Sequence, residues 1–318
     1  MRAGAHALGL LAAPMHVAIL RALSETPTSL VDLRRAVGNP PQTTMRKHLA
    51  ALAEVGIVAR ERDTHFGASV TYTLQKPGTD LLGLARVLEA WLAMASPAPV
   101  ELGTVAARSA IKALAEGWST TLLRALAARP LTLTELDALI SDVSYPSLER
   151  RLAAMRLAGQ VDPIAATGRG TPYAVTTWLR RAVVPLVSAV CWERRHLAEG
   201  TAPIGRLDIE TAFLLAVPLL KLDEEHSGSC RLAVETAGKE GVRRSVGVLI
   251  GIEEGRVAYC RARLEGDATT SASGSVNAWY RAIAEGHADQ LEAVGDRALA
   301  DTVLAGLHAS LVRPVASA

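Results

Sequence analysis

Apolar residues recur at helical spacing in two similar stretches of the chain, separated by about 100 positions. When residues 19–58 are compared with the residues 103 positions later, 12 of the 40 pairs are identical, without a gap. Beyond this stretch the offset falls to 101, which aligns Tyr72 with Tyr173 and Trp91 with Trp192. The pattern predicts an internal duplication, in which the second copy lost two residues where a hairpin tip would tolerate the loss.

Each copy predicts three helices followed by a β-hairpin. A first helix ends in ILRAL or LLRAL and is stopped by Pro27 or Pro130, and a short second helix (SLVDLRRAV or TLTELDALI) begins at a Ser or Thr cap. The third helix buries one face through apolar residues at i, i+4 and i+7: Met45, Leu49 and Leu52 in the first copy, and Leu148, Leu152 and Met155 in the second. Gly56 or Gly159 then serves as a C-cap, and two β-prone arms around a polar, Gly-containing tip predict the hairpin.

Three helices and a hairpin in this order make a winged helix-turn-helix. The segments LLRAL, SLVDLRRAV, TTMRKHLAALAEVGIVARE and YTLQKPGTDLL resemble bacterial winged-helix regulators of the MarR, ArsR and HxlR type, and are most similar to HxlR-like proteins. The resemblance covers about 200 residues, once in each copy, and implies a DNA-binding transcriptional regulator. HxlR-like proteins usually carry a cysteine near the first helix, and this chain has none there, so thiol-based sensing is not carried over.

In a winged helix-turn-helix, exposed side chains at the start of the third helix reach base edges in the major groove, while basic residues and the wing hold phosphates. The candidate DNA contacts are Gln42, Thr43, Thr44, Arg46 and Lys47 on the first reading helix, Tyr145, Ser147, Arg150 and Arg151 on the second, and Arg60, Arg62 and Arg169 on the hairpins. Glu149 stands where the first copy has Arg46, which predicts weaker or different contacts in the second copy.

Two other interpretations of these residues stay open. The basic side chains also fit ordinary solvated charges on a helix surface. Winged helices serve in addition as protein-interaction or dimerisation modules, which makes a lipid-type carrier or scaffold protein the alternative function.

The duplication suggests a domain organisation. Because single-copy relatives pair as homodimers through their first and last helices, the two copies are expected to form a pseudo-twofold unit in which LLGLARVLEAWLAMA and VVPLVSAVCWERRHLA are the last helices that pair. The Pro-containing segment 95–103 is the linker. We expect winged helix-turn-helix domains at 1–98 and 99–200, a third domain at 201–318, and possible homodimerisation of the chain.

The last third predicts an α+β domain. An apolar helical segment is followed by short strands, a helix with Trp279 and Tyr280, and a final helix opened by residues 291–299. This order resembles the sterol-carrier-protein-2-like fold, over about 100 residues, and implies a cavity for an apolar molecule. The candidate wall residues are Phe213, Leu214, Leu220, Trp279, Tyr280 and Ile283, each of which also fits plain core packing.

Composition and charge exclude several classes. The chain has 318 residues and 49% hydrophobic content, which argues against a disordered protein. Its net charge of +2 requires neither a nucleic-acid nor a membrane partner. Residues 1–100 hold 10 Lys and Arg against 7 Asp and Glu, residues 101–200 hold 12 against 9, and residues 201–318 hold 12 against 16. No apolar run spans a membrane, the opening apolar residues are read as a first helix rather than a signal peptide, and three dispersed cysteines fit a reducing cytoplasm.

Enzyme signatures are missing from the sequence. Gly247, Gly251 and Gly255 have a four-residue repeat rather than GxGxxG spacing, and the histidines and acidic pairs match no catalytic or metal motif. We therefore expect no catalytic residues, no cofactor and no metal. The predicted function is a cytoplasmic regulator, a repressor, whose tandem winged helices bind double-stranded operator DNA and whose C-terminal domain senses an apolar small-molecule effector.

Overall fold

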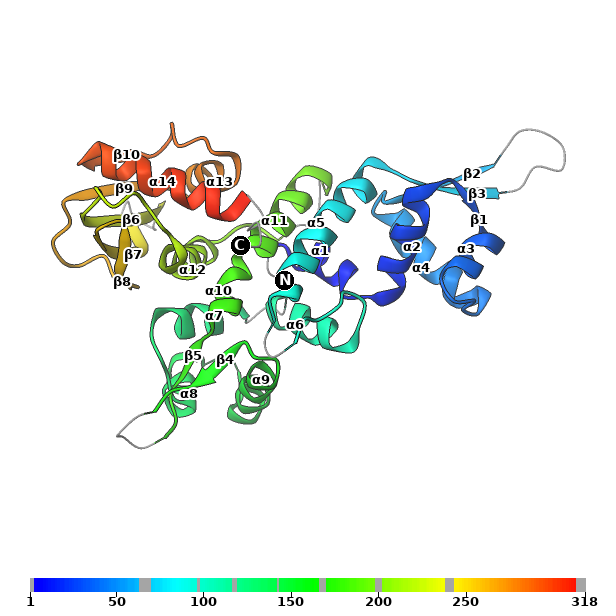
Figure 1. Cartoon of the computed structure of the whole chain (residues 1–318), viewed down its shortest axis with the longest axis horizontal. Coiled ribbons are helices and arrows are strands. Elements are labelled where there is room, and N and C mark those ends of the chain that lie inside the picture. Colours follow the sequence, from blue (N-terminus) through cyan, green and yellow to red (C-terminus); the bar gives the residue numbers. More distant parts are fainter. Residues whose placement is uncertain are drawn as a thin grey trace. The chain divides into compact units, whose positions relative to one another are not determined.

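The computed structural model of the chain (Figure 1) describes residues 3–62, 70–95, 98–115, 119–141, 143–165, 170–197, 202–237 and 243–312. The chain divides into two compact units. One contains residues 4–115 and 188–201, and the other contains residues 1–3, 116–187 and 202–318. These units do not follow the three predicted domains segment by segment, because the second copy contributes to both.

The unit formed by residues 4–115 and 188–201 holds most of the first copy. Its elements are α1 (Ala5–Leu11), α2 (Pro14–Glu25), β1 (Thr28–Ser29), α3 (Leu30–Ala36), α4 (Gln42–Glu54), β2 (Val58–Arg62), β3 (Val70–Leu74), α5 (Lys76–Ala93), α6 (Val105–Ala115) and the end of α11 (Val183–His196). The strands form a sheet in the order β1-β3-β2. Three helices and an antiparallel hairpin therefore occur where the pattern of the first copy predicts them.

Local sequence explains these helices. Pro14 occupies the first turn of α2, where the missing N–H costs nothing, and Ser29 caps α3 by accepting from the backbone N–H of Asp32. The apolar side of α4 consists of Met45, Leu49 and Leu52, all buried as the i, i+4, i+7 spacing predicts. Gly56 follows with a φ of 68°, the left-handed conformation expected of a helix-ending glycine.

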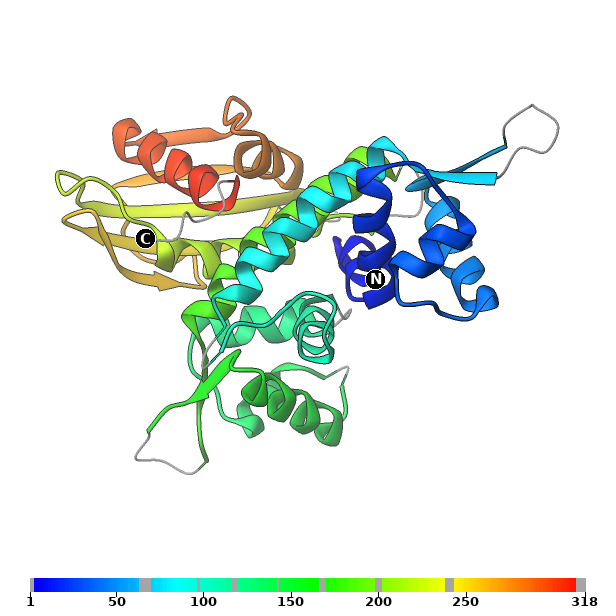
Figure 2. The ribbon, with the colours of Figure 1, turned by 45° about the vertical axis from the view of Figure 1, so that its right-hand side comes forward.

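Segments of the second copy complete this unit. Helix α6 packs on α1, and the Arg108 Nε–H donates to the backbone oxygen of Ala12 at 3.3 Å. The end of α11 lies beside the start of α5 (Figure 2). The Trp192 Nε1–H donates to Pro77 O at 2.8 Å, and His196 Nε2 lies 2.9 Å from Asp80 Oδ2. The side chain of Glu193 is buried and receives the backbone N–H groups of Gly4, His6 and Ala7 at the start of α1.

The other unit begins with α7 (Ser119–Ala128), α8 (Leu133–Leu139), α9 (Tyr145–Leu157), β4 (Val161–Pro163), β5 (Tyr173–Val175) and α10 (Thr177–Arg181). Helices α8 and α9 begin and end 103 residues after α3 and α4. The hairpin register agrees as well, since Val161 pairs with Val175 as Val58 pairs with Leu74. The position of α5 is taken by two helices, α10 and α11, and Pro185 lies in the first turn of α11, where its lack of an N–H is tolerated.

The last third forms a five-stranded sheet with helices packed on it. Its elements are α12 (Arg206–Ala216), η1 (Val217–Leu219), β6 (Gly228–Ala237), β7 (Arg243–Glu253), β8 (Arg256–Arg261), β9 (Thr270–Ser275), α13 (Val276–Tyr280), the π-helical η3 (Arg281–Glu285), β10 (Glu292–Gly295) and α14 (Arg297–Val312). The strand order is β10-β9-β6-β7-β8, with β6 and β9 parallel and the other pairs antiparallel. Helices α12, α13 and α14 contact the sheet and α12 contacts the other two.

One predicted element in this region is wrong. Residues 291–295 were expected to open the final helix, but Glu292–Gly295 form the edge strand β10, paired with β9. Gly295 has a φ of 91°, which a helix cannot contain, and an added Cβ would lie 2.1 Å from Thr269 O. The helix begins afterwards, where Asp296 Oδ1 accepts the N–H of Leu299 at 3.1 Å.

The last third is attached to the second copy inside the same unit. The Arg124 guanidinium on α7 pairs with Glu210 on α12, whose side chain is 2% exposed. Thr120 Oγ1 donates to Asp208 Oδ1 at 3.1 Å, and Arg180 Nη1 donates to Leu214 O at 2.7 Å. The equivalent of Arg124 in the first copy, Arg21, pairs with Glu89 of α5 instead.

Among the described residues, no single helix is long and apolar enough to cross a membrane. Helices α1 and α2 meet the length and hydropathy requirement only when taken together, and they are bent by 79° relative to each other.

Candidate nucleic-acid interface

The outward side of α4 is polar and basic. Gln42, Thr43, Arg46 and Lys47 are exposed, and Thr44 is half-buried. They lie on the first turns of a 13-residue helix whose opposite side is held in the core. An exposed helix of this kind, with cations and hydroxyls at its N-terminal end, has the composition that contacts bases and phosphates in the major groove.

The turn between α3 and α4 fixes where the exposed side begins. Gly38 and Asn39 have φ values of 87° and 60°, and the backbone N–H of Asn39 donates to Arg34 O at 2.7 Å. The Arg34 Nε–H donates across the turn to Pro40 O at 2.9 Å. Residue 41 is proline, which leads directly into α4. The turn therefore positions the N-terminal end of α4 through local contacts.

A pair of histidines connects α2 with α4, and the sequence did not predict this contact. The rings of His16 on α2 and His48 on α4 meet edge to face with centroids 5.0 Å apart, and His16 Nδ1 contacts Leu10 O at 3.0 Å. Burial lowers the pKa of His16, and desolvation, followed by the nearby charge of Lys47, lowers the pKa of His48. Both rings are therefore neutral at pH 7, and no motif in the sequence indicates that positions 16 and 48 meet.

The hairpin contributes one described cation. Arg60 on β2 is exposed and pairs in register with Tyr72 on β3. Arg62 ends β2, but its side chain lies outside the described residues, as does the whole of Arg169. The structure thus places Arg60 on the strand that follows α4, and the two arginines at the hairpin tips stay predictions.

The second copy presents a different set of side chains. Tyr145 and Arg150 are exposed on α9, Ser147 is half-buried, and Arg150 Nη2 donates to Ser147 Oγ at 3.3 Å. Arg151 is half-buried. Glu149 is exposed on the same helix, where the first copy has Arg46.

The predicted wall residues of the last third are placed together in its interior. Phe213, Leu214, Leu220, Trp279 and Ile283 are buried, and Tyr280 is half-buried. The rings of Phe213 and Trp279 meet edge to face at 4.7 Å, and the Trp279 Nε1–H donates to Ala233 O at 2.8 Å. These contacts describe a packed core; the binding role of its residues stays a prediction.

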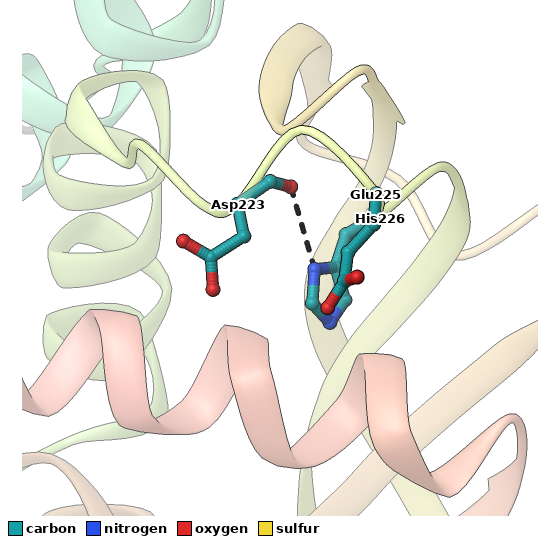
Figure 3. A group of neighbouring side chains, drawn as sticks. All are labelled: Asp223, Glu225 and His226. Carbon is teal, nitrogen blue, oxygen red and sulfur yellow. Dashed lines mark hydrogen bonds between the residues drawn. The ribbon is translucent and has the colours of Figure 1, made fainter.

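Asp223, Glu225 and His226 form an acidic and imidazole cluster before β6 (Figure 3). Both ring nitrogens of His226 are engaged, Nδ1 with Asp223 O at 3.3 Å and Nε2 with Thr302 Oγ1 at 3.1 Å. The Asp223 carboxylate points away from the imidazole ring in Figure 3. One ligand atom of each residue lies within 4.8 Å of those of the other two, and the contact with Thr302 fastens the loop to α14.

Comparison with known proteins identifies one domain of the chain. A family model described as a helix-turn-helix domain matches residues 11–61, the segment from the end of α1 to β2. A comparison with curated proteins gave no match. The chain therefore carries an N-terminal helix-turn-helix domain, which suggests a DNA-binding regulator.

Proposed function

We propose that the protein is a transcriptional repressor that reads operator DNA with α4 of its first copy. The observation that carries this proposal is the exposed side of α4, with Arg46 and Lys47 beside Gln42 and Thr43, inside the segment that matches the helix-turn-helix model. The hairpin β2–β3 acts as the wing, and Arg60 supplies a phosphate contact next to the groove.

Local charge supports this assignment. Residues 28–62, from β1 to the end of β2, hold six Lys and Arg against three Asp and Glu, a net charge of +3. Because each contact between a cation and a phosphate releases counterions, binding through this surface becomes weaker as salt is added. The neutral pair His16 and His48 adds no charge behind the helix at pH 7.

We also propose that the second copy is a winged helix and that the last third, with its sterol-carrier-like order of elements, binds an apolar effector. The support is the π-helical turn η3, which directly follows α13, the helix that carries Trp279, and contains Ile283, because π-helical turns are frequent at functional sites. Coupling requires that the effector bind two arrangements of the protein with different affinity. The ion pair of Arg124 with Glu210 provides a physical connection between this domain and α7.

The DNA proposal is tested by fluorescence anisotropy with duplex DNA from upstream of the gene. Loss of Arg46 alone should weaken specific binding by about 1–3 kcal/mol if it contacts a base, and Arg46→Ala with Lys47→Ala should weaken it further. The matched control removes two exposed cations elsewhere, with Arg86→Ala and Arg297→Ala. Equal affinities for the two double variants would refute the assignment to α4.

The effector proposal is tested by titrating apolar metabolites against tryptophan fluorescence and against operator affinity in parallel. Trp279→Phe identifies which of the five tryptophans responds. A response of Trp279 without a change in DNA affinity would support a carrier function instead. Absence of both responses would contradict effector binding.

A further inference from the structure

The two copies differ in exposed side chains on and around their third helices, α4 and α9. At positions 103 residues apart, polar or small side chains of the first copy are replaced by large apolar ones or by the opposite charge: Ala36 by Leu139, Gln42 by Tyr145, Arg46 by Glu149, Glu54 by Leu157, and Glu61 by Ile164. The backbone elements are nevertheless in register. The second copy thus has the same helices and hairpin register as the first but different side chains at these positions.

The apolar replacements are solvent-exposed. Leu157, at the end of α9, has 90% of its surface exposed, and Leu139, Tyr145 and Ile164 are exposed as well. Together they make up four of the seven large hydrophobic residues exposed in the described part of the chain, within a segment of 26 residues. Four exposed apolar side chains within one short segment exceed the scattered single residues of an ordinary solvated surface and favour an interaction site.

Charge argues against DNA as the partner of this surface. Residues 131–165, which correspond to residues 28–62, hold three Lys and Arg against five Asp and Glu, a net charge of −2 instead of +3. Helix α9 itself carries Arg150, Arg151 and Arg156, but Glu149, at the position of Arg46, repels phosphate, and the exposed apolar side chains gain nothing from contact with it. These residues favour a partner that offers apolar side chains together with charges of both signs.

The pattern along α9 fits a second copy of the same helix. One side of the helix is formed by residues at i, i+4, i+8 and i+11, which are Tyr145, Glu149, Ala153 and Arg156. All four side chains are exposed. When two such helices pair antiparallel about a two-fold axis beside Ala153, Glu149 of each faces Arg156 of the other. A small residue at the centre allows close approach, and the charges are complementary only in this reciprocal arrangement.

We propose that the α9 surface of the second copy, formed by Leu139, Tyr145, Glu149, Ala153, Arg156, Leu157 and Ile164, is a self-association site that pairs two chains around a two-fold axis. The interface buries the apolar side chains and is fixed in register by two reciprocal pairs of Glu149 with Arg156. It uses no residue of α4. Self-association requires no nucleic acid, so its test is independent of the DNA proposal.

Sedimentation velocity on the full chain, over about 1–200 µM to cover the affinity of a small interface, measures the monomer and dimer fractions. Leu157→Glu is expected to weaken association at least tenfold. The matched control is Val294→Glu, which places the same charge at another exposed apolar residue, on β10, and should leave association unchanged. Circular dichroism confirms that both variants remain folded.

Charge reversal tests the arrangement of the pair. Glu149→Arg and Arg156→Glu should each weaken association, because like charges then meet across the axis, and the double reversal should restore it. The proposal is overturned by a wild-type chain that stays monomeric over the whole range, by equal effects of Leu157→Glu and Val294→Glu, or by a double reversal that remains as weak as the single ones. A partner other than a second copy would give the first of these results.

Discussion

At the scale of single residues, buried polar groups carry the clearest consequences. Glu193 is 3% exposed, and its two carboxylate oxygens accept three backbone N–H groups at 2.7–3.0 Å. These groups are the unpaired donors at the start of α1, where a negative charge is also favourable. Glu193 therefore joins the end of the second copy to the beginning of the first.

Glu193→Ala should lower the free energy of unfolding by about 2–4 kcal/mol, because two buried donors and one part-buried donor lose their acceptor at once. Glu193→Gln should cost less, since one amide oxygen still accepts. Denaturant titration followed by circular dichroism measures both, and Glu101→Ala, at an exposed glutamate, is the control. A change below about 0.5 kcal/mol for Glu193→Ala would contradict the role assigned to this carboxylate.

Cys230 gives a prediction about pH. It is fully buried in β6, and burial raises the pKa of its thiol to about 12. Because an unfolded cysteine ionises near pH 8.5, the neutral thiol adds stability at lower pH that is lost as the pH rises from there through 12. Iodoacetamide at pH 8.5 should therefore modify the Cys230 peptide far more slowly in native than in denatured protein, as mass spectrometry can measure. Equal rates would contradict the burial.

Single residues also show which features of the structure could be predicted from the sequence and which could not. The exposed and buried sides of α4 follow from helical spacing alone, so Arg46 outside and Met45 inside were predictable. The pairing of His16 with His48 depends on how α2 crosses α4, which no local pattern contains. Glu193 is similar, since its partners lie almost 190 positions away in the sequence.

At the scale of elements, packing and a turn explain why Gly247, Gly251 and Gly255 lie four positions apart. An added Cβ at Gly247 on β7 would lie 1.9 Å from Leu232 O, and one at Gly251 would lie 2.2 Å from the ring of Tyr259. Gly255 has a φ of 72° in the turn to β8. The spacing therefore reflects a close approach, an aromatic neighbour and a turn.

Gly247→Ala should separate β7 from β6 locally and lower the free energy of unfolding by more than about 2 kcal/mol, because the obstructing atom belongs to the backbone. Gly83→Ala on α5 is the matched control, since nothing lies within 4 Å of its added Cβ. It should be neutral or stabilising by about 1 kcal/mol, as expected for alanine inside a helix. Thermal unfolding of both variants is the measurement, and equal midpoints would refute this account.

Element boundaries were predictable where capping residues and periodicity agree. Helix α3 begins after Ser29, and α4 ends before Gly56, as the signals in the sequence indicate. The strand β10 was missed because residues 292–295 alone form a short segment with weak β-propensity, whose pairing partner β9 lies some 20 residues earlier. Pairing with β9, rather than the local conformational preference of residues 292–295, therefore determines this strand.

At the scale of the whole molecule, the duplicated sequence predicts consecutive domains, whereas the second copy contributes segments to both compact units. Helix α6 and the end of α11, which belong to the second copy, pack with the first. Helix α12 of the last third packs on α7. Aligning the sequence of one copy with that of the other cannot predict how the second copy is divided between the units. The division depends on which apolar surfaces pack together rather than on the helices and strands that each copy forms.

The division into two units predicts two calorimetric transitions, each sensitive to its own buried carboxylate. Glu193 stabilises the unit of residues 4–115 and 188–201, and Arg124 pairs in the other unit with Glu210, whose side chain is 2% exposed. Arg124→Met leaves the Glu210 charge buried without a partner, which costs about 3–5 kcal/mol. For units of this size, either loss corresponds to a fall of about 10 °C in Tm. We expect Glu193→Ala to lower only one transition and Arg124→Met only the other in scanning calorimetry of the full chain. If both variants lowered the same transition, the units would not unfold separately, because the segments that the second copy contributes to each would then bind the whole chain into one cooperative structure.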